Sequence, residues 1–383
     1  MNKPVTTSMI SQSDGKKVLV IGFNARHVVC SAKRAGYNVT TVSHFSDCDL
    51  VKCGDRTLAI HEEFTGFLKD LDYNSVKDTI KDIEYDSAIL ASGFEALEIP
   101  KILGNDPKVA SFINNKKMLR GKLESLGYRV PKHFELEDTI KYPVIIKPQN
   151  GAGGFKNALV RDSTQLNDVV SSFHENEWHE FVIEEYIKGL DASSSVLSTN
   201  NQAVTIAVNE QLLGLRNLGP MKRFSFCGSI TPLKTAFTRE IEAVSESIAI
   251  DFGLIGSNGI DFVIGPDGPV VIEVNPRFQG TLDTVERALG INVFDAHVKA
   301  CLGELIQRPE HRRFAARVVY FAERDFEIRK RLSQPFYMDI PCKGTHIQRG
   351  KPVISAIGCG KSRDIAFNAA MRRIEAARKI YDA

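Results

Sequence analysis

Apolar and polar positions near the N-terminus alternate in blocks that predict a strand, a helix and a second strand. The strands are Lys17–Gly22 (KVLVIG) and Val39–Ser43, and the helix is Ala25–Ala35, which ends at Gly36. Ser87–Ser92 (SAILAS), closed by Gly93, predicts a later strand of the same parallel sheet. The first unit therefore resembles a Rossmann-like βαβ arrangement.

The turn after the first strand decides between two roles for this unit. Its sequence, Gly22 to Arg26 (GFNAR), lacks the second and third glycines of the dinucleotide-binding fingerprint. We therefore expect a structural domain rather than an NAD site.

An apolar stripe at helical spacing follows, in a helix expected from about Lys108 to Gly127. Lys116 lies on this stripe, whereas Lys117 points about 100° away, toward water. A lysine on an apolar face can extend its amine to solvent, or it can serve a binding site. The stripe is formed by Val109, Phe112, Leu119, Leu123 and Leu126.

A glycine-rich loop joins two predicted strands in the middle of the chain. Tyr142–Pro148 (YPVIIKP) ends with Lys147 and leads into Gly151, Gly153 and Gly154, before the strand Asn157–Arg161. Glycines let backbone N–H groups approach phosphate oxygens, although a simple hairpin turn would also use them. The Walker A pattern is absent, so Lys147 is the feature that favours phosphate binding.

The next apolar segment, Phe181–Gly189 (FVIEEYIKG), carries Glu184 and Glu185 and is followed by Asp191. Its backbone could read adenine while the acid beyond it binds ribose hydroxyls. An ordinary edge strand with solvated glutamates explains the same pattern.

The segment Asn258–Arg277 predicts a β-hairpin that brings two carboxylates together. Two alternating strands flank the turn cluster GPDG, and Gly268 suits the left-handed position of a three-residue loop. If the hairpin centres on Asp267, Asp261 lies opposite Glu273, and Asn275 shares their face. Paired like charges repel unless a divalent cation binds them, and Mg²⁺ prefers such oxygen ligands. The alternative is that both acids face water or pair with lysines.

The C-terminal region predicts a smaller unit with a strand at Ala315–Phe321, a turn at Gly350 leading into a strand, and a final helix. The helix has basic residues away from its apolar stripe, which is usual for a solvated face, so we expect no nucleic-acid partner. The stripe consists of Ala366, Ala370, Ile374, Ala377 and Tyr381.

Composition adds mainly exclusions. At roughly 100–200 residues per domain, 383 residues suggest two or three domains, and a net charge of +2 nominates no polyanionic partner. The 7 cysteines include no C-x-x-C pair, which predicts reduced thiols, and no segment is apolar enough to span a membrane. We therefore expect a cytoplasmic protein. His297 and Cys301 lie four residues apart on an expected helix, and we expect them to serve packing rather than chemistry.

Taken in order, these features resemble the ATP-grasp superfamily between about Asn105 and Gly303. The segment GFNARHVVCSAKRAGYNVTTV looks most like the archaeal-type predicted carboligases of this superfamily. The resemblance implies an α/β fold with an α+β ATP-grasp domain at residues 108–310. A Rossmann-like pre-ATP-grasp domain at 1–107 would precede it, and a small C-terminal α+β unit at 311–383 would follow.

The resemblance also implies a role for each motif. Lys116 and Lys147 would contact ATP phosphates beneath the loop Gly151–Gly154, and Arg277 would stabilise the transferring phosphoryl group or an acyl phosphate. Adenine would contact Glu184, Glu185 and Ile187, and ribose would contact Asp191. Mg²⁺, or Mn²⁺ in its place, would bind Asp261, Glu273 and Asn275, so the catalytic set is Arg277, Lys147 and Asn275.

The implied activity is an ADP-forming ligation of a small carboxylate to an amine through an acyl phosphate. A bicarbonate-activating carboxylase or synthetase and a nonenzymatic nucleotide-binding protein are the alternatives. Homodimers are common in the superfamily, and a homodimer is one option here. Arg216, Lys222 and Arg223 lie where substrate-contacting groups often occur, and their sequence context does not choose among them.

Overall fold

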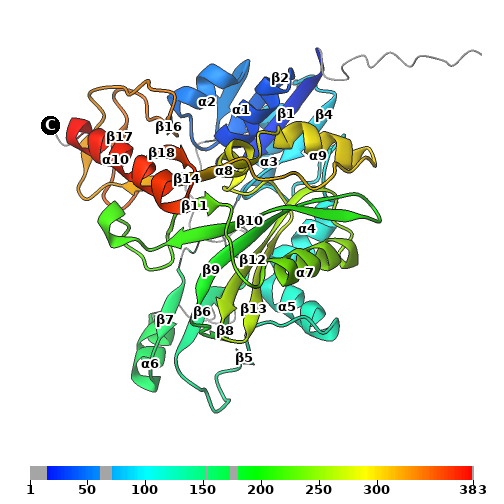
Figure 1. Ribbon diagram of the computed structural model, residues 1–383, viewed down its shortest axis with the longest axis vertical. Helices are drawn as coiled ribbons and strands as arrows, with labels where there is room; N and C mark the ends of the chain where they lie inside the picture. The colour runs from blue at the N-terminus through cyan, green and yellow to red at the C-terminus, as the bar shows by residue number, and fades with distance from the viewer. Residues whose placement is uncertain (1–14, 61–70, 152–153, 155, 173–179, 382–383) are drawn as a thin grey trace, which may run out of the picture.

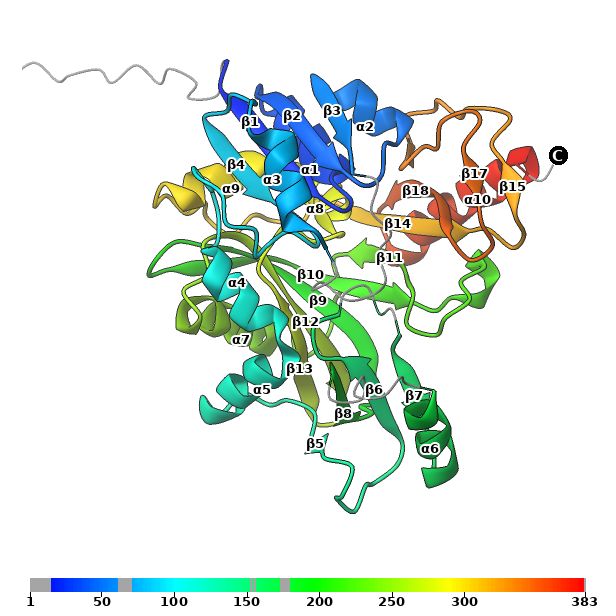
Figure 2. The same cartoon turned by 180° about the vertical axis from the view of Figure 1, so that it is seen from behind.

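The computed structural model describes residues 15–60, 71–151, 154, 156–172 and 180–381. Three bodies follow one another vertically in Figures 1 and 2: an N-terminal sheet at the top, a large central sheet, and a small antiparallel sheet at the bottom. The C-terminal residues lie beside the N-terminal sheet, at the upper end of the central sheet.

The N-terminal sheet is parallel, with the strand order β3-β2-β1-β4, and confirms the predicted βαβ unit. Val18 and Val20 of β1 pack on the side of α1, whereas Leu19 and Ile21 pack on the side of α3. This burial on both faces explains the uninterrupted apolar run. The elements are β1 (Lys17–Gly22), α1 (Arg26–Arg34), β2 (Asn38–Ser43), α2 (Cys48–Cys53), β3 (Arg56–Ala59), α3 (Tyr73–Ile80) and β4 (Ser87–Leu90).

Two helices lead out of this sheet where a single helix was expected. Asn115 has extended backbone torsions (φ −83°, ψ 102°), and its side chain accepts a hydrogen bond from the Met118 amide. It therefore ends α4 (Pro107–Asn114) and caps α5 (Lys116–Ser125). The expectation of one continuous helix was wrong because an asparagine can satisfy the first amides of a new helix better than it continues an old one.

The small sheet is antiparallel, with the order β5-β8-β6-β7, and is covered by α6 (Ser163–Ser171). The strand predicted at Phe181–Gly189 ends already at Glu185, and Asp191 belongs to a separate strand of the central sheet. The strands are β5 (His133–Phe134), β6 (Val144–Pro148), β7 (Ala158–Val160) and β8 (Phe181–Glu185).

The central sheet has the order β13-β12-β9-β10-β11-β14-β18-β16, so C-terminal strands extend a sheet built mainly from the middle of the chain. Helices α4, α5 and α7 (Thr238–Asp251) pack on one face near β12 and β13. Helices α8 (Leu282–Leu289) and α9 (Val293–Cys301) bring this sheet to the N-terminal unit. The strands are β9 (Leu190–Ser198), β10 (Ala203–Leu213), β11 (Phe226–Thr231), β12 (Gly256–Gly265), β13 (Gly268–Asn275), β14 (Phe314–Phe321), β16 (Tyr337–Met338) and β18 (Pro352–Gly360).

The C-terminal helix α10 (Arg363–Tyr381) lies on β14 and β18, and its predicted apolar stripe is buried throughout. A two-stranded ribbon, β15 (Phe326–Glu327) with β17 (His346–Ile347), lies beside it. Within the described part of the chain, no helix is long and apolar enough to cross a membrane.

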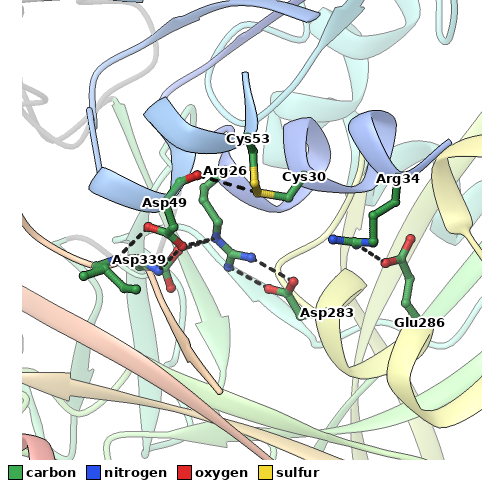
Figure 3. The surroundings of a disulfide bond; sticks show 9 residues. Arg26, Cys30, Arg34, Asp49, Cys53, Asp283, Glu286 and Asp339 are labelled. Carbon is green, nitrogen blue, oxygen red and sulfur yellow. Dashed lines mark hydrogen bonds and ion pairs between the residues drawn. A yellow bond between two sulfur atoms is a disulfide. The ribbon is translucent and has the colours of Figure 1, made fainter. Parts of the chain in front are cut away.

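A buried charge cluster joins the N-terminal unit to the rest of the molecule (Figure 3). Arg26, at the start of α1, donates two hydrogen bonds to Asp283 of α8, at 2.8 and 2.6 Å, and one to Asp339 at 2.9 Å. Arg317 of β14 also binds Asp339, at 2.5 Å. The turn after β1, which lacks the dinucleotide fingerprint, thus contributes its arginine to a contact between the N-terminal unit and the rest of the molecule.

Four of the cysteines form disulfides, so the expectation of reduced thiols was wrong for them. Cys30 pairs with Cys53, which links α1 to the end of α2, and Cys48 at the other end of α2 pairs with Cys342. Because the partners are 23 and 294 residues apart, spacing in the sequence could not reveal either pair. Helix α2 is consequently fastened to both the N-terminal and the C-terminal units.

The Cys48–Cys342 link should contribute measurably to stability. We expect the double variant Cys48→Ser/Cys342→Ser to unfold at a lower temperature than the parent in nonreducing buffer, because a long cross-link typically contributes about 2–4 kcal/mol. Dithiothreitol should lower the melting temperature of the parent and affect the double variant less. Cys359→Ser, which removes a free cysteine, is the control. Alkylation of all seven cysteines in unreduced, denatured protein would contradict the assignment.

Candidate functional site

The hairpin β12–β13 places Asp261 directly opposite Glu273, as the sequence predicted. The route to this pairing differs from the expectation. The loop contains two residues, Pro266 and Asp267, rather than three, and a β-bulge between Asp261 and Phe262 shifts the register by one position. The shorter loop and the bulge compensate each other, so the carboxylates face one another although the hairpin is not centred on Asp267.

Three side-chain amides surround the Asp261 carboxylate. Gln211 and Gln279 donate to Oδ1 at 2.8 and 3.3 Å, and Asn275 donates to Oδ2 at 3.1 Å. Burial and the nearby charge of Glu273 nevertheless raise the pKa of Asp261 to about 7. These amide donors therefore stabilise the charge of Asp261 incompletely.

Glu273 has the opposite electrostatic environment. Burial would raise the pKa of its carboxyl, but the charges of Lys116, Lys147 and Arg277 outweigh burial and hold that pKa below its usual value. Lys116 makes a direct ion pair with it, Nζ to Oε1, at 3.3 Å. One carboxylate of the pair is thus firmly ionised, whereas the other remains protonatable near neutral pH.

Lys116 connects three segments that are distant in sequence. It is the first residue of α5, its Nζ donates to the Gly151 carbonyl at 2.7 Å, and its amide donates to the Gln149 carbonyl. The same Nζ reaches Glu273 on β13. Lys117 instead pairs with Glu135 at the surface, so the choice of Lys116 over Lys117 agrees with the structure even though the helix is interrupted.

Lys147 and Glu184 form a buried ion pair between β6 and β8. Their side chains are each 7% exposed, and Nζ lies 2.5 Å from Oε2. Glu185 points outward beside the Lys132 amide, at 3.4 Å. Of the two glutamates that the sequence could not tell apart, Glu184 therefore belongs to the interior and Glu185 to the surface.

The glycine-rich loop is described at two of its three glycines, and Gly153 lies outside the described residues. Gly151 is buried beside Lys116. Gly154 has φ +69°, and a Cβ there would lie 2.6 Å from the Phe224 carbonyl oxygen. Close backbone approach between two loops explains the requirement for glycine at this position.

Asp191, on β9 of the central sheet, interacts electrostatically with Arg223. Burial raises the pKa of Asp191 to about 6, and the charge of Arg223 opposes that rise. Arg223 donates to the Tyr186 hydroxyl at 3.1 Å and lies over the Tyr186 ring. Ile187 lies beside Gly265 of the hairpin. Lys222 is exposed, and Arg216 lies in a short 3₁₀ turn, Arg216–Leu218.

Arg277 follows the hairpin and forms an ion pair, through Nε, with Glu95. Glu95 belongs to the loop after β4, so the N-terminal unit contributes directly to this site. His297, by contrast, is structural: Nδ1 accepts from the Ser257 amide at 2.8 Å, Nε2 contacts the Leu103 carbonyl, and burial lowers its pKa to about 4. Cys301 contacts the same ring, which confirms the packing role expected for both residues.

Sequence reasoning missed Gln211, Gln279 and Glu95. For Gln279, the one related feature of the sequence is Gly259, two residues before Asp261. A Cβ at Gly259 would lie 1.7 Å from Gln279 Cδ, so a glycine there makes room for this amide. Gln211 comes from β10 and Glu95 from the N-terminal unit. No spacing pattern connects either of them to the hairpin.

The raised pKa of Asp261 predicts a specific pH dependence of stability without ligands. A carboxyl whose pKa is higher in the folded than in the unfolded state loses stabilisation as pH rises between the two values, here from about 4 to about 7. We expect Asp261→Asn to become more stable relative to the parent between pH 5 and pH 8, as measured by thermal unfolding. Asp267→Asn, in the exposed turn, should show no such trend. A constant difference between Asp261→Asn and the parent across this range would contradict the pKa assignment.

Comparisons with known proteins relate the central part of the chain to a family. Residues 113–281 match the family described as the ATP-grasp domain. Over 359 residues the chain is 27% identical to an uncharacterized protein of Methanocaldococcus jannaschii, covering 89% of this chain and 88% of that protein.

Solved structures extend the likeness to nearly the whole chain. The biotin carboxylase domain of Hydrogenobacter thermophilus 2-oxoglutarate carboxylase, a dimer in complex with MgADP, ADP and bicarbonate, has a TM-score of 0.72 at 18% identity and covers 96% of this chain and 90% of its own. L-amino acid ligase from Bacillus licheniformis has a TM-score of 0.67 at 18% identity, covering 96% and 97%. The expected fold is confirmed, and residues 113–281 form an ATP-grasp domain.

Proposed function

We propose that this protein is a Mg²⁺- and ATP-dependent ligase that joins a small carboxylate to an amine, releasing ADP and phosphate. The observation that carries the proposal is the convergence of Lys116, Arg277 and the Asp261–Glu273 pair, from separate elements, around one point of the central sheet. Such a site is rich in charge and needs no nucleophilic side chain, which suits phosphoryl transfer by positioning and neutralisation.

The nucleotide would lie between the small sheet and the central sheet. Lys116 and Lys147 would contact phosphates, and the loop Gly151–Gly154, which includes Gly153, would cover them. The backbone of Glu184, Glu185 and Ile187 would hold adenine, and Asp191 would bind ribose. The contact of Lys116 with both Gly151 and Glu273 supports this arrangement, because one amine already links the loop to the carboxylates.

The donor set fits a hard divalent cation such as Mg²⁺ or Mn²⁺. Within the described ranges no cluster of three or more His, Cys, Asp and Glu residues could hold a metal. A cation here would therefore use Asp261, Glu273 and Asn275 together with substrate phosphates, the usual pattern for Mg²⁺. Asn275 now turns its amide nitrogen toward Asp261, and half a turn of the amide would present its oxygen instead. The cation would neutralise charge on the phosphates.

The proposed reaction has two steps. A substrate carboxylate oxygen attacks the γ-phosphorus of ATP, and the bond from that phosphorus to the β–γ bridging oxygen breaks. ADP is released, and the substrate becomes an acyl phosphate. The amine then attacks the acyl carbon, phosphate leaves, and the amine gives up a proton. Arg277 would balance the charge of the phosphoryl group in the first step and of the acyl phosphate in the second, with Lys147 and Asn275 as the other catalytic groups.

A bicarbonate-activating carboxylase or synthetase is the second candidate. The observation behind it is the likeness to a biotin carboxylase domain over nearly the whole chain, which L-amino acid ligase shares to the same extent. Carboxyphosphate would then take the place of the acyl phosphate. The remaining alternative, a nonenzymatic nucleotide-binding protein, would bind ATP without turnover.

One screen separates these activities. Purified protein with Mg²⁺ and ATP is assayed for ADP release across amino acids and other small carboxylates, with and without amines, and with bicarbonate in a separate arm. We expect ADP release that requires both a carboxylate and an amine. Bicarbonate-dependent release without an added amine would favour the carboxylase, binding without release would favour the nonenzymatic protein, and failure to bind ATP would reject both enzymatic candidates.

Three further expectations remain proposals. The domain limits are set at 1–107, 108–310 and 311–383, although β14 pairs with β11 and joins the second and third of these units into one sheet. A homodimer and a cytoplasmic location are the other two, and the two disulfides remove the support that reduced thiols gave to that location.

A further inference from the structure

The loop after β4 supplies a carboxylate to the end of the metal-site hairpin. Glu95 is 4% exposed, and its carboxylate forms an ion pair with Nε of Arg277. Arg277 is otherwise held weakly, since its Nη1 donates to the Phe278 carbonyl at 3.5 Å. The buried anion is therefore the stronger restraint on the guanidinium.

Glu95 is itself rigidly placed. Both of its carboxylate oxygens lie 3.1 Å from the Gly93 amide, which donates to them. Gly93 has φ +90°, a conformation that favours glycine, and the neighbouring Phe94 and Leu97 are fully buried. Because its own turn and two core side chains hold it, the Glu95 carboxylate moves little and can orient a partner side chain.

A second contact from the same side fixes the backbone before Arg277. Asn105 donates to the Pro276 carbonyl at 2.8 Å and to Asn258 Oδ1 at 2.7 Å, and its own Oδ1 accepts from the Ile255 amide. The segment from Asn275 to Arg277 is thus held from the N-terminal side at its backbone by Asn105 and at its side chain by Glu95. Two independent contacts at one short segment indicate that its position matters.

We infer that Glu95 is a positioning residue that orients Arg277 for the phosphoryl group. The inference rests on the proposed function for the role of Arg277, and extends it to a residue of the N-terminal unit. An ion pair through Nε leaves Nη2, and Nη1 apart from its long contact with the Phe278 carbonyl, to meet the oxygens of a second anion. The N-terminal unit is then required for catalysis, because it sets the direction of a catalytic side chain.

The test compares Glu95→Gln with Glu98→Gln, a matched change at an exposed glutamate of the same loop. Glutamine keeps the shape and the contact with the Gly93 turn but removes the charge that holds Arg277. We expect Glu95→Gln to lower kcat for ADP release by about 10- to 100-fold, with the KM for ATP within about twofold of the parent, because small misplacement of a catalytic group is costly. Glu95→Asp should recover part of kcat, since it keeps the charge.

A double-variant cycle distinguishes positioning from general support of the fold. In an Arg277→Met background, Glu95→Gln should reduce kcat no further, because the group that Glu95 orients is gone. Independent, multiplicative losses in the double variant would overturn the inference. So would an unchanged kcat in Glu95→Gln.

A readout without turnover keeps this inference separate from the proposed function. Hydrogen–deuterium exchange of the ligand-free protein should become faster at the backbone amides of residues 277–279 in Glu95→Gln and stay unchanged in Glu98→Gln. If the parent shows no turnover with any substrate, the proposed ligase fails, and the exchange result alone decides whether Glu95 orders this segment. Unchanged exchange there would overturn the positioning role.

Discussion

Replacing Glu273 with glutamine is expected to lower Mg²⁺-dependent ATP turnover by about a hundredfold or more while the fold is retained. Glutamine can still accept a hydrogen bond from Lys116, but it removes the charge that a divalent cation requires. The side chain is 35% exposed, so little core packing is lost. Steady-state ADP release and thermal unfolding, measured on the same preparations, check the two parts of this expectation.

A second result should accompany it. Because the charge of Glu273 helps to raise the pKa of Asp261, Glu273→Gln should lower that pKa. The loss of stability between pH 5 and pH 8 should then become smaller than in the parent. Glu240→Gln, an exposed change on α7, is the matched control for turnover and pH dependence. Full turnover in Glu273→Gln would reject the metal assignment.

The second large effect is expected at the buried pair Lys147–Glu184. Lys147→Met leaves the Glu184 carboxylate buried without its cation, which should cost about 3–5 kcal/mol of unfolding free energy. It should also weaken the binding of ATP, because an ammonium that would contact phosphates is lost. Chemical denaturation and titration calorimetry with Mg²⁺ and ATP measure these two effects.

The double variant Lys147→Met/Glu184→Gln separates the two roles of Lys147. A neutral amide at position 184 removes the unpaired charge, so most of the lost stability should return. ATP binding should remain at least about tenfold weaker than in the parent, since no cation is restored. Glu185→Gln, at the exposed neighbour, should leave stability unchanged. Recovery of ATP affinity in the double variant would show that Lys147 serves only the ion pair.

The parts of the fold that follow from local patterns were predictable. The strands β1, β2 and β4, the hairpin β12–β13 and the apolar stripe of α10 all agree with the sequence analysis. The interruption at Asn115 was missed because residues on both sides continue the apolar stripe, whereas a capping contact depends on one side chain. The hairpin shows a different limit, since its loop length and its bulge were both missed and their effects cancel.

The residues of the candidate site likewise fall into those that the sequence pattern reveals and those that only the folded structure reveals. Lys116, Lys147, Asp261, Glu273 and Asn275 stand out because their residue types interrupt apolar elements, which is a property of the sequence itself. Glu95, Gln211 and the disulfide partners interrupt nothing. They matter only because the loop after β4, strand β10 and residue 342 approach other elements in the folded chain.

By itself, the sequence determined the order of the elements, the hairpin that carries Asp261 and Glu273 on its two strands, and the resemblance to the ATP-grasp superfamily, because these depend on periodicity and on residues close along the chain. Only the tertiary structure decided which glutamate Lys147 binds, which cysteines pair, and which acid orients Arg277. Each of these depends on side chains brought together by packing between sheets. Ion-pair and hydrogen-bond partners that are far apart along the chain produce no periodic pattern in the sequence, because the segment between them can vary in length and composition.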